Sequence, residues 1–162
     1  MPDLPAFNSA HQDELRPLLA ECLAAPRWVD AVLAGRPYAD VDALLAAAHR
    51  AAEGLSDDEV RAAIAGHPRI GERATGDGPG ARWSADEQSG VAASAAERLA
   101  AANAAYEERF GHVYLVRATG LSGEQVLADL TARLANPPGV ELRVANRELA
   151  GIAALRLGKV LS

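Results

Sequence analysis

Apolar residues recur along most of the chain at intervals of three or four positions, which places them on one side of an α-helix. Residues that cap helices begin these runs, and glycine or proline ends most of them. The pattern therefore predicts helices from one end of the chain to the other. The expected ranges are 8–23, 26–35, 40–54, 56–66, 84–109, 122–136 and 140–161.

Several predicted helix starts carry recognisable caps. Asn8 and Ser9 can cap the first helix, and Asp40 can cap the third. In a capping box, a serine is followed three residues later by Glu or Gln, and each side chain bonds the other residue's backbone N–H. This spacing occurs in Ser56-Asp57-Asp58-Glu59 and Ser122-Gly123-Glu124-Gln125.

Two stretches interrupt the helical pattern. Residues 71–83 contain four glycines and Pro79, which predicts a loop. Residues 113–118 are rich in β-favouring residues, but a single extended segment has no partner with which to build a sheet. We therefore expect an all-α, single-domain helical bundle over residues 1–162. It should contain about seven to nine helices, one short extended segment and one Gly-rich loop.

Composition narrows the possible partners. The chain has a net charge of −6, which argues against a nucleic-acid or anionic-membrane partner because either needs a basic patch. Cys22 is the only cysteine, so no internal disulfide can form, and it is expected in the core. Residues 1–6 lack the features of a secretory signal, and no stretch approaches the ~20 apolar residues of a membrane span. We expect a cytoplasmic protein.

His67 is the first candidate for chemistry. It follows Gly66, where the helix is expected to stop, and precedes Pro68. The proline disfavours helical backbone at His67 and should hold the imidazole at the helix end. The ordinary alternative is a capping or surface histidine.

The second candidate is the segment Ser84-Ala85-Asp86-Glu87-Gln88. Its Ser-x-x-Glu spacing is that of a capping box, which would be purely structural. However, Ser84 and Gln88 continue an apolar stripe, and Glu87 lies on its flank. Buried polar groups need partners, and a ligand at the helix N-terminus could supply them. The two interpretations can hold together. The stripe consists of Val91, Ala95, Leu99, Ala102 and Tyr106.

The third candidate is Arg156 in the last predicted helix. It lies about 20° from Leu149 around the helix, inside an otherwise apolar face. An arginine at the edge of such a face would extend its head group into water, whereas a central one needs an anion or carbonyl partner. Arg143 and Arg147 lie on the opposite side and should be solvated. The rest of the apolar face is formed by Leu142, Ala145, Ala153 and Val160.

Together these features resemble one family, the 2-oxo-4-hydroxy-4-carboxy-5-ureidoimidazoline (OHCU) decarboxylases. The pairing of a His-Pro segment with a Trp-Ser-x-x-Glu-Gln segment is specific, whereas either motif alone would be weak. The resemblance extends in order over essentially the whole chain. It is carried by His67-Pro68-Arg69-Ile70-Gly71-Glu72, Trp83-Ser84-x-x-Glu87-Gln88, Phe110-Gly111-x-x-Tyr114-Leu115-Val116-x-Ala118-Thr119-Gly120 and Glu148-Leu149-x-x-Ile152-x-x-Leu155-Arg156-Leu157.

The resemblance implies an all-helical homodimer that converts its ureide substrate to (S)-allantoin in urate degradation without a cofactor. It assigns the catalytic roles to His67, Glu87 and Arg156. The substrate-binding positions that it implies are Pro68, Ser84, Gln88, Leu115, Val116 and Ala118, the last three through their main chain. The four histidines show no metal-ligand spacing, in agreement with a metal-free site.

Two positions depart from the family pattern. Arg117 stands where relatives often carry cysteine or another small residue, and Gly151 stands where they often carry lysine. A glycine inside a helix costs up to ~1 kcal/mol. Arg117 could alter the pocket wall, unless that segment contributes mainly backbone groups.

Three alternatives remain open from the sequence. A non-catalytic helical module that binds a ureide or another small polar ligand would keep Ser84, Gln88 and Arg156 but would not need His67 and Glu87 together. A hydrolase or isomerase of a neighbouring ureide would use the same pocket with different proton transfers. A purely structural protein would have the three polar features far apart.

Overall fold

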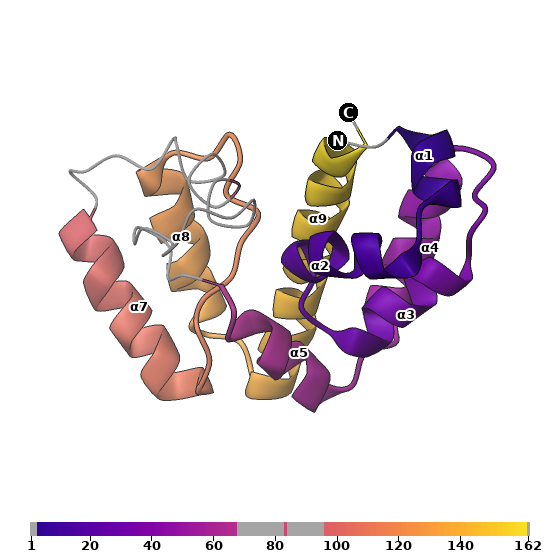
Figure 1. Cartoon of the computed structure of the whole chain (residues 1–162). Coiled ribbons are helices and arrows are strands. Elements are labelled where there is room, and N and C mark those ends of the chain that lie inside the picture. The colour runs from indigo at the N-terminus through magenta and orange to yellow at the C-terminus, as the bar shows by residue number, and fades with distance from the viewer. Residues whose placement is uncertain (1–2, 68–82, 84–95, 162) are drawn as a thin grey trace. The chain divides into compact units, whose positions relative to one another are not determined.

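The computed structural model describes residues 3–67, 83 and 96–161 (Figure 1). Within these residues the structure is helical and contains no strand, which confirms the predicted all-α class. The helices of this described part are α1 Leu4–Ser9, α2 Gln12–Cys22, α3 Pro26–Ala34, α4 Val41–Glu53, α5 Asp57–Ile64, α7 Ala96–Phe110, α8 Gly123–Arg133 and α9 Pro138–Val160. None of them combines the length and apolar character needed to cross a membrane.

Predicted caps begin three of the described helices, α4, α5 and α8. Asp40 accepts the Ala43 backbone N–H at 2.7 Å, at the start of α4. Ser56 and Glu59 form both hydrogen bonds of a capping box, at 2.9 and 3.2 Å. Ser122 begins α8 with a second complete capping box. Local side-chain chemistry therefore positions these helices as the sequence predicts.

The prediction of a single helix over residues 8–23 was wrong, because α1 and α2 divide this part of the chain. Asp3 caps α1 by accepting the Ala6 backbone N–H, and His11 caps α2 by accepting that of Asp13. Asn8 does not cap a helix. Its side-chain Nδ2 donates to the Tyr38 carbonyl at 2.9 Å, and its Oδ1 accepts the Tyr38 backbone N–H at 2.8 Å. A tertiary contact thus uses the polar groups that the sequence assigned to a cap.

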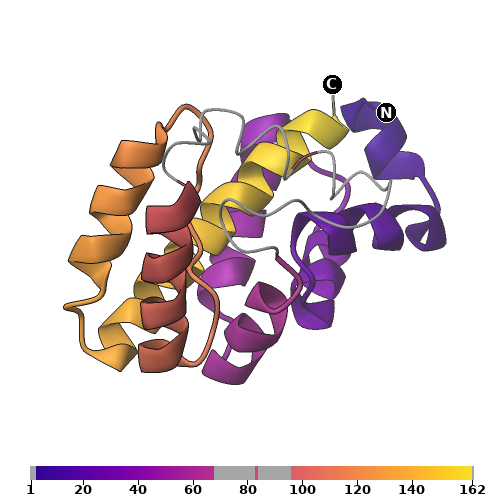
Figure 2. The same cartoon turned by 90° about the vertical axis from the view of Figure 1, so that its left-hand side faces the viewer.

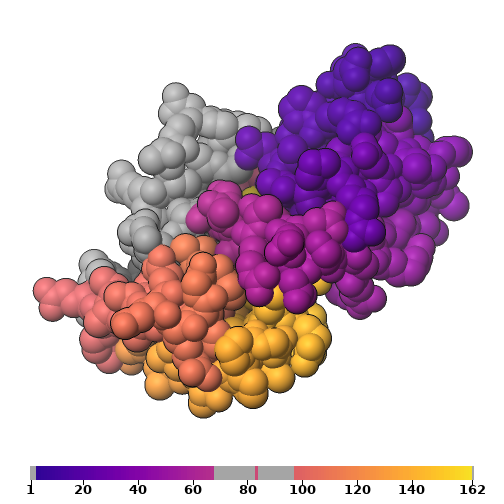
Figure 3. Space-filling model, turned by 90° about the horizontal axis from the view of Figure 1, so that it is seen from below, coloured from indigo at the N-terminus to yellow at the C-terminus, as the bar shows by residue number. Residues whose placement is uncertain are grey.

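The chain divides into two compact units, unit 1 (Met1–Ala63 and Leu149–Ser162) and unit 2 (Ile64–Glu148). The expectation of one domain over residues 1–162 stays a prediction. In unit 1, α3 packs against α2 and α4. The fully buried Trp28 of α3 donates its indole N–H to the Ala48 carbonyl of α4 at 2.9 Å. Figure 3 shows the indigo-to-magenta residues of the chain as a continuous packed surface.

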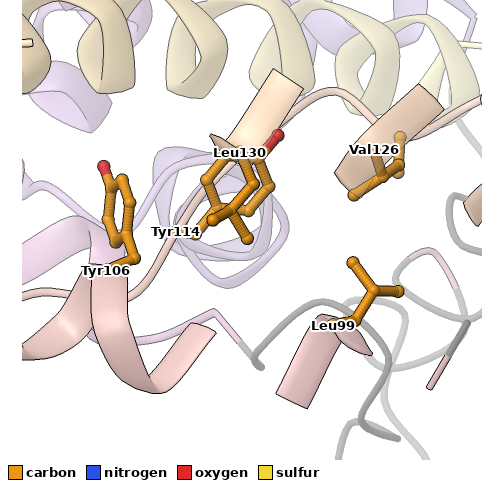
Figure 4. Close-up of a cluster of buried hydrophobic side chains, with 6 residues drawn as sticks. Leu99, Tyr106, Tyr114, Val126 and Leu130 are labelled. Atoms are coloured by element: carbon orange, nitrogen blue, oxygen red, sulfur yellow. The ribbon is translucent and has the colours of Figure 1, made fainter. Parts of the chain in front are cut away.

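Unit 2 is built on the packing of α7 against α8, which lie side by side in both Figure 1 and Figure 2. The predicted apolar stripe on α7 is confirmed at Leu99 and Tyr106, which are buried (Figure 4). The part of the predicted helix 84–109 before Ala96 lies outside the described residues, as does the Gly-rich loop apart from Trp83. The buried cluster of unit 2 consists of Leu99, Tyr106, Tyr114, Ala118, Val126 and Leu130.

Residues 113–118 lie between α7 and α8 and form neither helix nor strand. This confirms the prediction of a segment that does not pair into a sheet. A glycine with positive φ precedes the segment and another follows it, Gly111 at 78° and Gly120 at 80°. Residues that carry a side chain rarely adopt that backbone conformation, so both turns favour glycine. The segment carries three of the predicted binding residues, and its anchoring therefore matters for the site.

Candidate active site

His67 lies just beyond the end of α5, as the sequence predicts. Its backbone N–H donates to the Ile64 carbonyl at 2.9 Å, which closes the last turn of the helix, and the residue is half-buried. Trp83, which begins the second motif, is buried with 6% of its surface exposed. The predicted site residues that follow these two in the sequence, Pro68, Ser84, Glu87 and Gln88, lie outside the described residues.

Arg156 lies inside the apolar face of α9, with only 4% of its surface exposed. Its Nη1 donates to the Glu21 carbonyl at 2.8 Å. The last four carbonyls of a helix lack intrahelical partners, and Glu21 is in the last turn of α2. The structure thus confirms that Arg156 is central and that it has a carbonyl partner. Arg143 and Arg147 are exposed, also as predicted.

Cys22 lies next to the residue that Arg156 contacts and is completely buried. Burial raises the pKa of its thiol to about 12, although the positive charge of Arg156 acts in the opposite direction. A thiol with so high a pKa is protonated at neutral pH and is a poor nucleophile. This confirms the interpretation of Cys22 as a core residue.

Leu115, Val116 and Ala118 lie in the connecting segment of unit 2. The side chains of Leu115 and Ala118 are buried, and Ala118 belongs to the core cluster. The Leu115 carbonyl accepts a hydrogen bond from Arg133 at 2.8 Å, and the Arg117 N–H donates to Glu148 at 3.4 Å. The Arg117 side chain is exposed. The departure at Arg117 therefore leaves the anchored main chain of this segment in place.

A buried ion pair in unit 2 was missed by the sequence reasoning. Glu141 of α9 is fully buried, and Arg133 at the end of α8 is 5% exposed. Glu141 accepts hydrogen bonds from Arg133 Nη2 at 2.7 Å and Nε at 2.9 Å, and from the Tyr106 hydroxyl at 2.6 Å. Asn136 also donates to this carboxylate, at 3.2 Å. The pair thus links the start of α9 to α7 and α8.

The same guanidinium reaches the aromatic core. The Cζ atom of Arg133 lies 4.6 Å from the centre of the Tyr114 ring. Its Nη1 donates to Asp129 Oδ2 at 3.3 Å. The Tyr114 hydroxyl donates to Asp129. A sequence signal for Arg133 existed, because it lies three residues after Leu130 and seven after Val126, on a buried helix face. This is the same signal that identified Arg156.

The ion pair shifts the pKa values of its neighbours. Burial alone would raise the pKa of the Glu141 carboxyl. Hydrogen bonds from Arg133 and Tyr106, with the charge of Arg133, outweigh burial and hold this pKa below its ordinary value of 4.5. Burial and the hydrogen bond to Glu141 raise the pKa of Tyr106, while burial and Asp129 raise that of Tyr114. At neutral pH, Glu141 is therefore ionised and both tyrosines are neutral.

The described residues of the predicted site fall in both units of the chain. Arg156 belongs to unit 1, whereas His67 and residues 115–118 belong to unit 2. The convergence of His67, Ser84, Glu87, Gln88 and Arg156 on one site stays a prediction. In the part of the chain that is described, no three His, Cys, Asp or Glu side chains are grouped so as to hold a metal ion.

Comparison with known proteins identifies the family. The sequence model of the OHCU decarboxylase family matches residues 8–158. The 2-oxo-4-hydroxy-4-carboxy-5-ureidoimidazoline decarboxylase of Haloferax volcanii is 27% identical over 161 residues, which cover 98% of this chain and 96% of that protein. The decarboxylase of the same name from Amia calva is 30% identical over 165 residues, covering 98% and 94%.

The fold agrees with this assignment. A crystal structure of OHCU decarboxylase in the presence of (S)-allantoin matches with a TM-score of 0.75 at 22% identity, covering 94% of this chain and 99% of that one. The similarity therefore spans almost the full length of both proteins. The chain belongs to the OHCU decarboxylase family.

Proposed function

We propose that this chain decarboxylates 2-oxo-4-hydroxy-4-carboxy-5-ureidoimidazoline to (S)-allantoin in urate degradation. The observation that carries this proposal is the match to the OHCU decarboxylase family across residues 8–158. The position of Arg156 supports it, because a buried guanidinium on an apolar helix face is suited to an anionic substrate.

The substrate explains why the proposed reaction needs no cofactor. Its carboxylate-bearing carbon adjoins a C=N bond, so the substrate is in effect a β-imino acid. When the bond to the carboxylate breaks, carbon dioxide leaves and its electron pair forms a new C=C bond, while the imine electrons move onto nitrogen. That nitrogen takes up a proton, a second proton adds to the carbon of the former imine, and the hydroxyl proton is lost to give the carbonyl. The face that receives the proton sets the chirality of allantoin.

The protein must therefore hold the carboxylate out of the ring plane, stabilise the developing charge and direct one proton. We assign His67 and Glu87 to the hydroxyl and carboxylate end, where they control its geometry and proton. Arg156 and main-chain N–H groups would stabilise the developing negative charge. An arginine presents five N–H donors in a fixed fork, and the hydrogen bond to the Glu21 carbonyl orients that fork.

The proposal also includes Ser84, Gln88 and Pro68 as substrate-binding residues, with the main chain of residues 115–118 as a wall beside the heterocycle. A small ureide is its expected partner. A homodimer and a cytoplasmic location complete the proposal, and light scattering and cell fractionation test them.

The direct test is to generate the labile substrate in solution from urate and to follow allantoin by circular dichroism. We expect the chain to accelerate product formation and to give one enantiomer. A module that only binds ureides would leave the spontaneous rate unchanged, and a hydrolase or isomerase would give a different product. A chelator arm tests cofactor independence separately. Activity that is lost with the chelator and restored by a divalent metal would refute only that part.

A further inference from the structure

Arg133 joins the buried ion pair to the segment that forms the proposed substrate wall. Its Nε and Nη2 bind Glu141, and its Nη1 donates to the Leu115 carbonyl at 2.8 Å. A guanidinium is planar, so binding one edge to a carboxylate fixes the direction of the remaining N–H groups. Glu141 thereby aims Arg133 at a single backbone oxygen.

The contacted segment depends on such anchors. Residues 113–118 form neither helix nor strand, and so their backbone groups are not held by a regular hydrogen-bond ladder. Arg133 holds the carbonyl of Leu115, and Glu148 accepts the N–H of Arg117. These two side chains act on the residues on either side of Val116. The backbone at Val116 is therefore fixed from both directions.

An ion pair is a costly way to fill this part of the core. The free energy needed to remove both charges from water offsets most of the attraction between them. Apolar residues of similar size are often at least as stabilising as such a pair. What Arg133 does that an apolar residue does not is donate to the Leu115 carbonyl while its position is locked by Glu141. The structure therefore points to a role in placing residues 115–118.

We propose that Arg133 is a positioning residue for the reaction, which it serves by fixing the main chain of residues 115–118 beside the substrate ring. Glu141 orients Arg133, and Glu148 holds the same segment from the Arg117 side. This inference rests on the proposed function, because the segment is a substrate wall only if the chain binds the ureide there.

The test is Arg133→Lys, which keeps a positive charge beside Glu141 but removes the planar fork. The matched control is Arg109→Lys, since Arg109 also donates to a backbone carbonyl of unit 2, that of Asn136 at 2.8 Å. A displacement of about 1 Å at an active site costs about a hundredfold in rate. We expect Arg133→Lys to lower kcat by about tenfold to a hundredfold. KM should change less, and the product should lose enantiomeric purity, whereas the control should match the wild type.

A second variant keeps the inference testable if Arg133→Lys does not fold. Glu148→Ala removes the other anchor from a half-buried position, and we expect a smaller change in the same direction. A wild-type chain without activity would overturn the proposed function and this inference with it. An active wild type whose folded variants keep its kcat, KM and product chirality would overturn this inference alone.

Discussion

Arg133 and Glu141 are both buried, so the effect of removing one charge depends on whether the other is still present. Glu141→Leu removes the buried carboxylate from Arg133, which keeps its contact with the partly exposed Asp129, and Arg133→Met leaves the Glu141 carboxylate without its cation. Breaking a buried pair in this way costs ~3–5 kcal/mol of the free energy of unfolding. Each single variant should therefore be destabilised by about that amount.

The double variant has no buried charge left in this pair. It leaves unpaired the Tyr106 hydroxyl, which donates to Glu141, and the Leu115 carbonyl, which accepts from Arg133. Each unsatisfied buried group costs ~1–3 kcal/mol, so the double variant should lose ~2–6 kcal/mol. The two single changes would lose ~6–10 kcal/mol if they were additive. Taken at their midpoints, the two ranges differ by about 4 kcal/mol, and we expect the double variant to fall short of the sum by about that amount.

Urea unfolding of the wild type, the two single variants and the double variant measures this coupling, with far-ultraviolet circular dichroism as the readout. The exposed pair Arg98 and Glu124 provides a matched control cycle in the same unit. Exposed ion pairs contribute little, and that cycle should give coupling near zero. Additive losses at Arg133 and Glu141 would refute the argument that the two charges depend on each other.

Two further predictions concern other contacts. The pKa of Glu141 is lowered in the folded chain, so its contribution to stability is present above the ordinary value of 4.5 and lost as pH falls through the folded pKa. The free energy of unfolding should accordingly fall less steeply with decreasing pH in Glu141→Gln than in the wild type. Equal pH profiles for the two chains would contradict this. Asn8→Ala removes two hydrogen bonds to Tyr38 and should cost ~1–3 kcal/mol in urea unfolding. Ser9→Ala, which loses only exposed local bonds, should cost less, and equal losses would contradict the pairing.

The parts of the fold that the sequence predicts are those set by neighbouring residues. The caps at Asp40, Ser56 and Ser122 need partners only three positions away, and all three form as expected. The boundary between α1 and α2 was not predicted, because Asn8 pairs with Tyr38, which is 30 residues away. A local pattern shows that a side chain can cap a helix, but not that a distant backbone competes for it.

The same distinction holds for the candidate site. The pattern around Arg156 predicts burial and the chemical class of its partner, a carbonyl or an anion. It does not identify Glu21, which is 135 positions away. Arg133 was missed altogether, although the apolar pattern of its helix indicated that it lies on a buried face. Its partners Glu141 and Leu115 lie beyond the ends of its own helix, where a helical period carries no information.

The proposed mechanism requires that His67 and Glu87 act in catalysis and not only in the fold. His67→Asn and Glu87→Gln preserve polar character, and the half-buried His67 follows a helix end, so the melting temperature and helicity should hardly change. His49→Asn, at an exposed position on α4, is the control. Proton transfer by a positioned side chain contributes about 10²–10⁴-fold.

The deciding measurement is the rate and sign of the allantoin circular dichroism signal, with the substrate generated from urate, for the wild type and these three variants. We predict that the wild type and His49→Asn form one enantiomer at the same accelerated rate. His67→Asn and Glu87→Gln should remain folded and lose most of that acceleration. Wild-type rates and unchanged chirality in both site variants would contradict the proposed mechanism.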